Sequence, residues 1–422
     1  MKIRASKSDL KGEILIPASK SHTIRAVAIA GIAEGTSVLK NYLVSADAIS
    51  CINGLKEFGA KIEENGKELT ITGTGGLPKP SCRKIDVGNS GTSLRILTGL
   101  ASLADFPIIF DGDKSIRTRP MTPLISALER LDAIIDSNDG KCPFTIRGPI
   151  KGGKTIVDGI SSQFLTSLLF ACPLAKNDTE IIVENLHERP YVEITLDWLR
   201  KLNIKFEKRE LDWFHIHGGQ KYKAFERTIP ADFSSATFAA CAVAITGSEV
   251  LIKGLDFSDH QGDKEVFTYL KNMGASVVHS PEGVIVKGGN LQGMDINMNN
   301  TPDALPAMAV LACFAKGTTR LLDVAQARLK ECDRIAAISA ELNKMGGKVE
   351  ELKDGLIIHQ SKLTGTNVHG YDDHRMVMAL TIAGMAASGK TIVDTAESTG
   401  VTYPSFVEDM KTLGANIEEI IE

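Results

Sequence analysis

The stretch "LKEFGAKIEE" (Leu55–Glu64) completes an amphipathic helix pattern, turns at a glycine and begins a β-rich segment. Five further segments keep this order, with Gly, Asp or Asn at the turn. They are "LERLDAIIDS" from Leu128, "LRKLNIKFEK" from Leu199, "LKNMGASVVH" from Leu270, "LNKMGGKVEE" from Leu342 and "MKTLGANIEE" from Met410. Successive starts lie 73, 71, 71, 72 and 68 residues apart. So regular a period indicates six copies of one structural unit.

A second pattern has the same period: an apolar helix, a short polar turn and a strand. Its turns fall at Gly35, Phe106, Asn177, Gly247, Gly317 and Gly389. Each unit of about 70 residues therefore carries two helices among short strands, which predicts a βαβαββ order.

The two helices of a unit differ in kind. The first, such as "ALPAMAVLACFA" (304–315), is apolar almost all round, which predicts burial on every side. The second, such as "DAISCINGLKEFG" (47–59), has a polar face. We therefore predict an α/β fold of two domains with three repeats each, in which buried helices lie inside outer sheets. A continuous solenoid is disfavoured because neither terminal unit resembles a polar cap.

The composition is that of an ordinary globular chain: 422 residues, 43% apolar, 24% charged, net charge −4. It does not favour a nucleic-acid-coating surface. We expect no signal sequence and no membrane span, since the longest apolar run, Phe164–Ala175, is short and contains Pro173. Seven scattered cysteines without a CxxC pair predict reduced thiols, a cytoplasmic location and no metal site.

Two motifs are decoys on this interpretation. "GPIKGGKT" (Gly148–Thr155) matches the P-loop pattern, but a strand-like "TIVDG" follows it instead of the helix that would meet the phosphates. "HIH" (His215–His217) alternates along a strand, so we interpret it as exposed strand histidines in preference to metal ligands.

The residues that lead into the six apolar helices are rich in polar and charged side chains. They are "ASKSHTIR" (18–25), "GNSGTSLR" (88–95), "GISSQFLT" (159–166), "ADFSSATF" (231–238), "NTPDALPA" (300–307) and "YDDHRMVM" (371–378). Helix capping explains the Ser, Thr, Asn and Asp. It does not explain Lys20, Arg25, Arg95 or the pair His374–Arg375, because a cation in the first turns opposes the helix dipole unless an anion binds there.

Loop cations add to this set: Arg117 and Arg119 in "RTRPM", and Arg328, Lys330 and Arg334 in "RLKECDR". Asp232, Asp303 and Glu331 are candidate acid–base groups, with exposed ion pairing as the alternative reading for Glu331. The residues alone thus predict a two-domain enzyme acting on a phosphorylated, multiply anionic small molecule.

Seven segments, in order along the chain, resemble 5-enolpyruvylshikimate-3-phosphate (EPSP) synthases. They are "GNSGTSLR", "RTRPM", "SSQFLTSLL", "RPYVEITL", "FAKGTTRL", "RLKECDR" and "YDDHRMVMA". The resemblance implies the enolpyruvyl transferase fold, a two-domain inside-out α/β barrel. It also implies a domain of residues 1–18 plus 231–422, an inserted domain of residues 19–230, and an active site in the cleft between them.

The implied reaction moves the enolpyruvyl group of phosphoenolpyruvate to the 5-hydroxyl of shikimate 3-phosphate and needs no cofactor. The residues implied for shikimate 3-phosphate are Lys20, Ser21, Arg25, Ser161, Ser162, Gln163, Asp303, Gln326 and Lys330. Those implied for phosphoenolpyruvate are Lys20, Asn89, Gly91, Arg119, Gln163, Arg334 and Arg375, with Arg95 nearby. The implied catalytic residues are Asp303 as base at the 5-hydroxyl, Glu331 and Lys20 as proton donors, and His374 as an assisting group.

Two residues depart from the family pattern. Val401 stands where many members carry a lysine that contacts phosphoenolpyruvate, and Glu188 stands where a serine often binds the shikimate phosphate. A carboxylate at position 188 would repel the ligand unless it pointed away.

Three alternatives remain open at this point. The related UDP-N-acetylglucosamine enolpyruvyl transferases carry a reactive cysteine in the loop equivalent to "DKSIRTRPM" (113–121), which lacks one here. A DNA clamp would place its cations on outer helices, and a catalytically dead homologue would serve as a binding scaffold. We expect a monomer that binds small-molecule substrates and neither nucleic acid nor membrane.

Overall fold

The computed structural model describes residues 1–79, 81 and 83–421, and the chain divides into two units. Unit 1 combines Met1–Pro17 with Pro230–Glu422, and unit 2 is Ala18–Ile229. The chain thus passes from one unit to the other at Pro17/Ala18 and again at Ile229/Pro230, each one residue from the boundary that the resemblance implied.

Unit 2 contains three four-stranded sheets with the orders β14-β3-β5-β4, β6-β7-β9-β8 and β10-β11-β13-β12. Their strands are β3 (Thr36–Lys40), β4 (Lys61–Asn65), β5 (Glu68–Thr72), β6 (Lys84–Asp86), β7 (Ile108–Asp111), β8 (Ile134–Asn138), β9 (Lys141–Arg147), β10 (Gly153–Asp158), β11 (Thr179–Glu184), β12 (Phe206–Arg209), β13 (Trp213–Ile216) and β14 (Glu226–Thr228). In each sheet the first two strands pair in parallel and the last two join as an antiparallel hairpin. This is the predicted βαβαββ order.

Unit 1 repeats the pattern in the sheets β16-β17-β15-β2, β18-β19-β21-β20 and β22-β23-β1-β24. Their strands are β1 (Lys2–Ser6), β2 (Lys11–Leu15), β15 (Glu249–Lys253), β16 (Ser276–Ser280), β17 (Gly283–Lys287), β18 (Asp295–Asn297), β19 (Thr318–Leu322), β20 (Lys348–Leu352), β21 (Gly355–His359), β22 (Asn367–Val368), β23 (Lys390–Val393) and β24 (Ile417–Ile420).

Three strands pair outside the repeat in which the sequence places them. β2 precedes the first repeat but pairs in parallel with β15 in unit 1. β14 precedes the fourth repeat but pairs in parallel with β3 in unit 2. β1, at the N-terminus, completes the sixth sheet between β23 and β24. Each unit is therefore closed by strands from distant parts of the chain.

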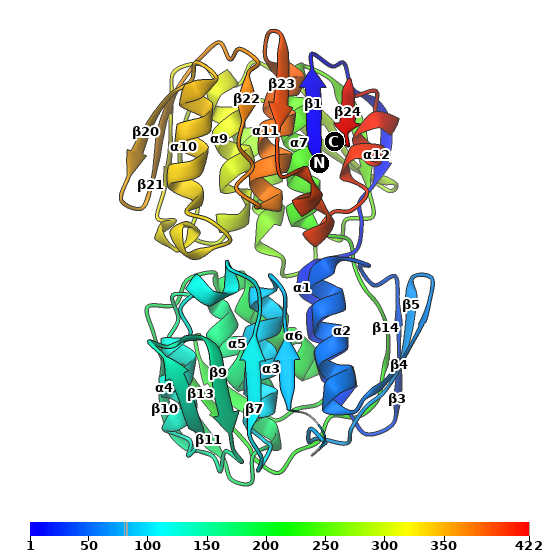
Figure 1. Ribbon diagram of the computed structural model, residues 1–422. Coiled ribbons are helices and arrows are strands. Elements are labelled where there is room, and N and C mark those ends of the chain that lie inside the picture. Colours follow the sequence, from blue (N-terminus) through cyan, green and yellow to red (C-terminus); the bar gives the residue numbers. More distant parts are fainter. Residues whose placement is uncertain (80, 82, 422) are drawn as a thin grey trace. The chain divides into compact units, whose positions relative to one another are not determined.

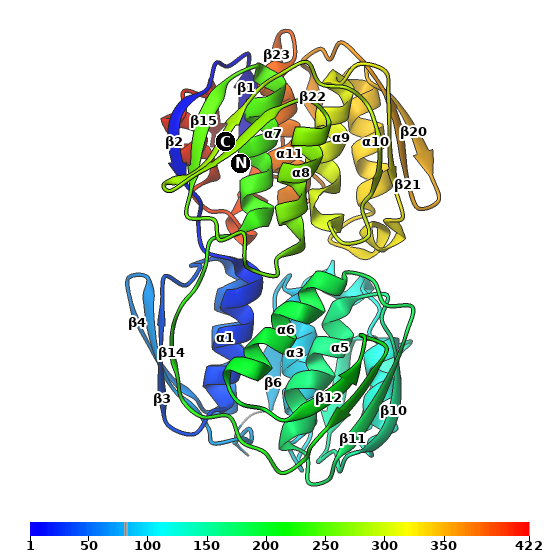
Figure 2. The same cartoon turned by 180° about the vertical axis from the view of Figure 1, so that it is seen from behind.

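Six helices are buried along nearly their whole length. They are α1 (Lys20–Ile32), α3 (Gly91–Ala101) and α5 (Ser162–Ala171) in unit 2, and α7 (Phe233–Thr246), α9 (Leu305–Phe314) and α11 (His374–Ala386) in unit 1. Figures 1 and 2 show each trio side by side inside its own unit, with the strands outside. The buried helices within outer sheets are as predicted, because an apolar surface on all sides of a helix must be covered on all sides.

The second helix of each repeat is the amphipathic one and covers the trio from outside. These helices are α2 (Ala46–Phe58), α4 (Thr122–Glu129), α6 (Arg189–Lys201), α8 (Glu265–Asn272), α10 (Arg334–Lys344) and α12 (Phe406–Thr412). The turn after each has the left-handed backbone at the same repeat position: Gly59, Asp132, Asn203, Gly274, Gly346 and Gly414. Glycine, aspartate and asparagine tolerate this conformation, which explains why only these residue types occupy the turn.

The apparent P-loop is no phosphate loop in the structure. Gly148–Thr155 runs from the end of β9 into β10, so strand follows strand, as predicted. Five cysteines are buried and Cys332 is partly buried, while Cys82 lies outside the described residues. Burial raises the pKa of Cys51, Cys142, Cys172 and Cys313 to about 12, which keeps these thiols protonated. Among the helices of the described residues, none is both long and apolar enough to cross a bilayer.

Candidate active site

Two guanidinium groups converge on the N-terminus of α3. Ser90 caps this helix by accepting the N–H of Ser93. A Cβ atom added to Gly91 would lie 2.6 Å from Nη1 of Arg95 and 2.7 Å from Nη1 of Arg119. Glycine at position 91 therefore makes room for both cations where the helix dipole is positive, an arrangement that suits an anionic ligand.

Hydrogen bonds fix these cations in place. Arg95 donates to Oε1 of Gln163 (2.8 Å) and lies over the ring of Phe164 at 5.3 Å. Arg119 donates to Oδ1 of Asn89 (2.8 Å). The structure thus gathers Asn89, Gly91, Arg95, Arg119 and Gln163, which we call the α3 cluster. All five were predicted from the sequence and its resemblance.

Arg25 lies inside unit 2 among four acceptors. Its guanidinium donates to Oγ1 of Thr195 (2.9 Å), to the carbonyls of Ser21 (3.0 Å) and Tyr191 (3.1 Å), and to Oγ1 of Thr166 (3.4 Å). Burial lowers the pKa of Arg25 to about 10, against the opposing effect of Tyr191 and Glu188. These contacts link the first two turns of α1 and α5 with α6.

Glu188 points at the start of α5. It is buried, has a left-handed backbone (φ 56°) and precedes α6. Its Oε2 accepts the hydroxyl of Ser162 (2.8 Å) and the N–H of Ser162 (3.3 Å). The carboxylate therefore occupies the helix N-terminus at which Ser161 and Ser162 were predicted to hold a phosphate, and it does not point away.

Lys20, the first residue of α1, pairs with the first turn of α2. Its Nζ lies 3.2 Å from Oδ2 of Asp47, and both side chains are largely buried. Ser19 caps α1 by accepting the N–H of His22. The lysine is thus held at a buried-helix N-terminus, as predicted, with its charge balanced by a carboxylate that sequence reasoning missed.

Arg334 is the centre of the second group, which lies in unit 1. Its guanidinium donates to Asp303 (2.8 Å), Glu331 (2.7 Å) and Asp373 (2.8 and 3.2 Å). Burial alone would lower the pKa of Arg334, but the three carboxylates together raise it well above its ordinary value. The guanidinium group of Arg334 is therefore always charged, and it binds all three carboxylates.

Arg375 closes this group from the start of α11. Its Nη2 lies 2.9 Å from Oδ2 of Asp303, so Asp303 bridges two guanidinium groups. We call Asp303, Glu331, Arg334, Asp373 and Arg375 the Arg334 cluster. Asp373 also caps α11 through the N–H of Arg375 (2.8 Å). Sequence reasoning missed its part in the cluster, although its place directly before the helix was a capping signal.

The other predicted residues of unit 1 lie near these groups in the chain. His374 is buried at the first position of α11, with Nδ1 4.0 Å from Oδ1 of Asp373. Gln326 donates to the carbonyl of Asn299 (2.9 Å), while its buried Oε1 has no hydrogen-bond donor among the described residues. Lys330 is partly buried and follows the short helix Ala325–Leu329. Val401 ends the short helix Ala396–Val401 and contributes no charge.

Asp263 is a third acid that sequence reasoning missed, after Asp47 and Asp373. It lies fully buried in the short helix Gly262–Lys264, where its Oδ2 accepts the hydroxyl of Ser234 in the first turn of α7. Burial, with nearby Asp303, raises the pKa of Asp263 to about 7, although Arg375 acts against the shift. Nothing in the local sequence indicated this, because the residue is brought to α7 by packing. Asp232, named from the sequence as an acid–base candidate, caps α7 through Ser235.

Two loop cations, Arg117 and Arg328, form ion pairs outside the two clusters. Arg117 forms a bidentate pair with Asp111 (2.9 and 2.8 Å). Arg328 pairs with Asp333 (2.6 Å) and Glu351 (2.7 Å). Both are therefore engaged in partly exposed ion pairs, whereas Arg119 and Arg334 from the same two loops are buried in the clusters.

The six-repeat fold with cations at its buried-helix N-termini defines the enolpyruvyl transferase class. Comparison with known proteins narrows this class. The family model described as EPSP synthase (3-phosphoshikimate 1-carboxyvinyltransferase) matches residues 5–410. The chain belongs to the EPSP synthase family.

Relatives cover the chain from end to end. The 3-phosphoshikimate 1-carboxyvinyltransferase of Ruminiclostridium cellulolyticum is 49% identical over 100% of both chains. The protein of the same name from Acetivibrio thermocellus is 48% identical over 99% of both. The solved EPSP synthase of Acinetobacter baumannii aligns with a TM-score of 0.83 at 28% identity, covering 99% of each chain. These findings confirm the predicted family, fold class and enzyme activity, and they do not favour the sugar-nucleotide alternative.

Proposed function

We propose that this chain transfers the enolpyruvyl group from phosphoenolpyruvate to the 5-hydroxyl of shikimate 3-phosphate and releases phosphate. The observation that carries the proposal is the pair of guanidinium clusters, one around Gly91 at α3 and one around Asp303 at α9 and α11. Both substrates carry phosphate and carboxylate groups, and arginine forks bind these groups in bidentate fashion.

The transfer takes place in two steps, an addition followed by an elimination. In the first, the 5-hydroxyl oxygen bonds to C2 of phosphoenolpyruvate, the hydroxyl loses its proton and the methylene carbon gains one, which gives a tetrahedral intermediate. In the second, the C2–phosphate bond breaks and the methyl group returns a proton, so that an enol ether and phosphate leave.

Asp303 is suited to take the hydroxyl proton. It is held by Arg334 and Arg375 and is about one-sixth exposed, so a substrate hydroxyl can reach it. A positioned carboxylate of this kind acts as a general base. We assign it to the 5-hydroxyl of shikimate 3-phosphate.

Glu331 and Lys20 are the proposed proton donors to the methylene carbon. Glu331 is bound to Arg334 at 2.7 Å, and Lys20 to Asp47 at 3.2 Å. An anionic substrate group bound to Arg334 would compete with Glu331 for the guanidinium. Freed from its cation, Glu331 would hold a proton more strongly and could deliver it, so substrate binding would itself prepare the acid. The assisting role of His374 stays a prediction.

Each substrate is assigned to residues in or near the two arginine clusters. We assign phosphoenolpyruvate to Lys20, Asn89, Gly91, Arg119, Gln163, Arg334 and Arg375. We assign shikimate 3-phosphate to Lys20, Ser21, Arg25, Ser161, Ser162, Gln163, Asp303, Gln326 and Lys330. The buried Oε1 of Gln326 supports this, because among the described residues it lacks a donor that a ring hydroxyl would supply.

Phosphate release tests the function directly. Phosphoenolpyruvate should yield phosphate only when shikimate 3-phosphate is present. UDP-N-acetylglucosamine is the matched acceptor control, and release with it, or with no acceptor, would contradict the assignment.

The predicted meeting of both clusters in one cleft stays a prediction, as do the monomeric state and the cytoplasmic location. Small-angle scattering with and without both substrates tests the first of these, since closure of two half-sites should compact the particle. Light scattering on the same samples reports the oligomeric state.

A further inference from the structure

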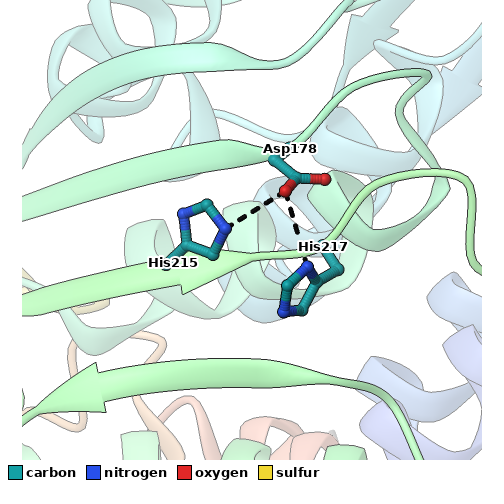
Figure 3. A group of neighbouring side chains, drawn as sticks. All are labelled: Asp178, His215 and His217. Atoms are coloured by element: carbon teal, nitrogen blue, oxygen red, sulfur yellow. Dashed lines mark hydrogen bonds and ion pairs between the residues drawn. The ribbon is translucent and has the colours of Figure 1, made fainter.

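Three metal-ligating side chains converge on the sheet β10-β11-β13-β12 of unit 2. His215 lies on β13, His217 follows the end of that strand, and Asp178 precedes β11 (Figure 3). The antiparallel pairing of Thr179 with Ile216 places Asp178 beside His217. All three side chains are between about a third and a half exposed, so an ion from solvent can reach them.

The spacing of the ligand atoms suits a small tetrahedral ion. Oδ2 of Asp178 lies 3.1 Å from Nε2 of His215 and 3.4 Å from Nδ1 of His217. A tetrahedron with metal–ligand bonds of about 2.0–2.1 Å has edges of about 3.3 Å. One ligand atom from each residue lies within 4.8 Å of the others, so a modest turn of the imidazoles completes the geometry.

One hydrogen bond already orients the carboxylate, and two further side chains lie beside the histidines. The N–H of Gly218 donates to Oδ1 of Asp178 (3.0 Å) and leaves Oδ2 facing the imidazoles. Oε1 of Glu207 lies 4.0 Å from Nε2 of His217, the ring nitrogen turned away from Asp178. Trp213 stacks on His215 with an interplanar angle of 17°. A carboxylate behind a ligating histidine and a hydrogen bond behind a ligating carboxylate are what protein metal sites use to fix their ligands.

We propose that Asp178, His215 and His217 bind a divalent transition-metal ion, with Zn²⁺ as the representative and water as the remaining ligand. Two imidazoles with one carboxylate favour Zn²⁺, Ni²⁺ or Cu²⁺, whereas Mg²⁺ and Ca²⁺ prefer oxygen ligands alone. The ion would tie the start of β11 to the end of β13. This departs from the interpretation of "HIH" as exposed strand histidines, because the sequence does not show that Asp178 faces both rings.

Titration of the full-length protein with Zn²⁺ tests the site. We expect one ion per chain by calorimetry, with affinity that rises with pH as the histidines lose their protons. Co²⁺ in place of Zn²⁺ should give the visible absorption of a tetrahedral site. His215→Ala and His217→Ala should each weaken binding by at least about tenfold. Glu207→Gln should weaken it by less, because the Glu207 carboxylate lies 4.0 Å from Nε2 of His217.

His359→Ala is the matched control. His359 also lies on a strand with a carboxylate near its Nε2, Glu350 at 3.4 Å, but among the described residues it belongs to no ligand group with a second histidine. This variant should bind Zn²⁺ as the wild type does. Zn²⁺ should also raise the melting temperature of wild type and of His359→Ala by the same amount, and that of His217→Ala by less.

Two results would overturn the proposal. If the wild type binds no Zn²⁺, the three residues are neighbours in polar contact and nothing more. If a variant lacking both His215 and His217 keeps its fold by circular dichroism and binds Zn²⁺ unchanged, the ion sits elsewhere.

Discussion

Glu188 is hydrogen-bonded twice to Ser162 at the N-terminus of α5. One carboxylate oxygen accepts both the hydroxyl and the backbone N–H of the serine. Glu188 therefore supplies the negative charge that a bound phosphate would supply. A ligand phosphate at Ser162 must displace this carboxylate or bind beside it, and like charges in a buried place repel strongly.

We expect Glu188→Ser to lower the KM for shikimate 3-phosphate by about tenfold, equivalent to about 1.4 kcal/mol of relieved repulsion. Its kcat should change little, because the proposed base, Asp303, and one of the two proposed proton donors, Glu331, belong to the other unit. Steady-state kinetics with varied shikimate 3-phosphate measures this. Glu188→Gln is the intermediate case, since it removes the charge but keeps the side-chain length. A raised KM in both variants would mean that Glu188 helps to build the site.

Gly91→Ala tests the convergence of Arg95 and Arg119. The added methyl group would meet both guanidinium ends, which can shift because they are the flexible tips of long side chains. We expect the KM for phosphoenolpyruvate to rise by about tenfold, while the free energy of unfolding changes by less than about 1 kcal/mol. Gly66→Ala, at an exposed turn, controls for a general glycine effect on kinetics. Unchanged kinetics in Gly91→Ala would remove the α3 cluster from the phosphoenolpyruvate site.

Arg334→Lys tests the buried ion network. Lysine cannot reproduce the fork that serves Asp303, Glu331 and Asp373, so buried carboxylates lose their partner. We expect a loss of about 3–5 kcal/mol in the free energy of unfolding, measured by urea denaturation, together with loss of turnover. Arg117→Lys is the matched control, because its bidentate pair with Asp111 is partly exposed and should cost under about 1 kcal/mol. An equal loss in the free energy of unfolding for both variants would show that the buried network stabilises the fold no more than an exposed ion pair does.

Asp303→Asn separates catalysis from binding. The amide keeps the shape and one acceptor oxygen but cannot take a proton. We expect kcat to fall by about 100- to 10,000-fold, the usual range for losing a general base. Binding of shikimate 3-phosphate, followed by calorimetry, should persist. Turnover close to that of the wild type would exclude Asp303 as the base.

The raised pKa of Asp263 predicts a pH dependence of stability. Since this pKa is about 7 in the folded protein and about 4 for an ordinary aspartate, the folded state holds the proton more tightly. Asp263 therefore stabilises the fold most at low pH, and this contribution is lost as pH rises from about 4 to about 7, at up to about 1.4 kcal/mol per pH unit. Relative to wild type, Asp263→Asn should gain stability over that window. Urea denaturation at several pH values measures this, with the exposed Asp136→Asn as the control that should follow the wild type.

The sequence by itself determined the repeat. The six turns with Gly, Asp or Asn and the six apolar helices are local features, because backbone conformation and hydrophobic periodicity act within a few residues. The cations at helix N-termini were visible for the same reason: a charge that opposes the dipole of its own helix is a local anomaly. Arg25, Arg95 and Arg375 are therefore recognisable from the sequence alone, and the family resemblance assigns roles to Arg25 and Arg375 and places Arg95 nearby.

Only the tertiary structure decided which charges meet. Arg334 binds Asp303 and Asp373, 31 and 39 residues away, and Lys20 binds Asp47, because packing of different helices brings them together. The orientation of Glu188 toward Ser162, the burial of Asp263 and the approach of Asp178 to two histidines depend on the same long-range packing. The exchange of β2 and β14 between repeats does too, because a strand's hydrogen-bonding partner lies in another part of the chain. Local pattern specifies each unit's elements, while contacts between distant residues determine the electrostatics on which the chemistry rests.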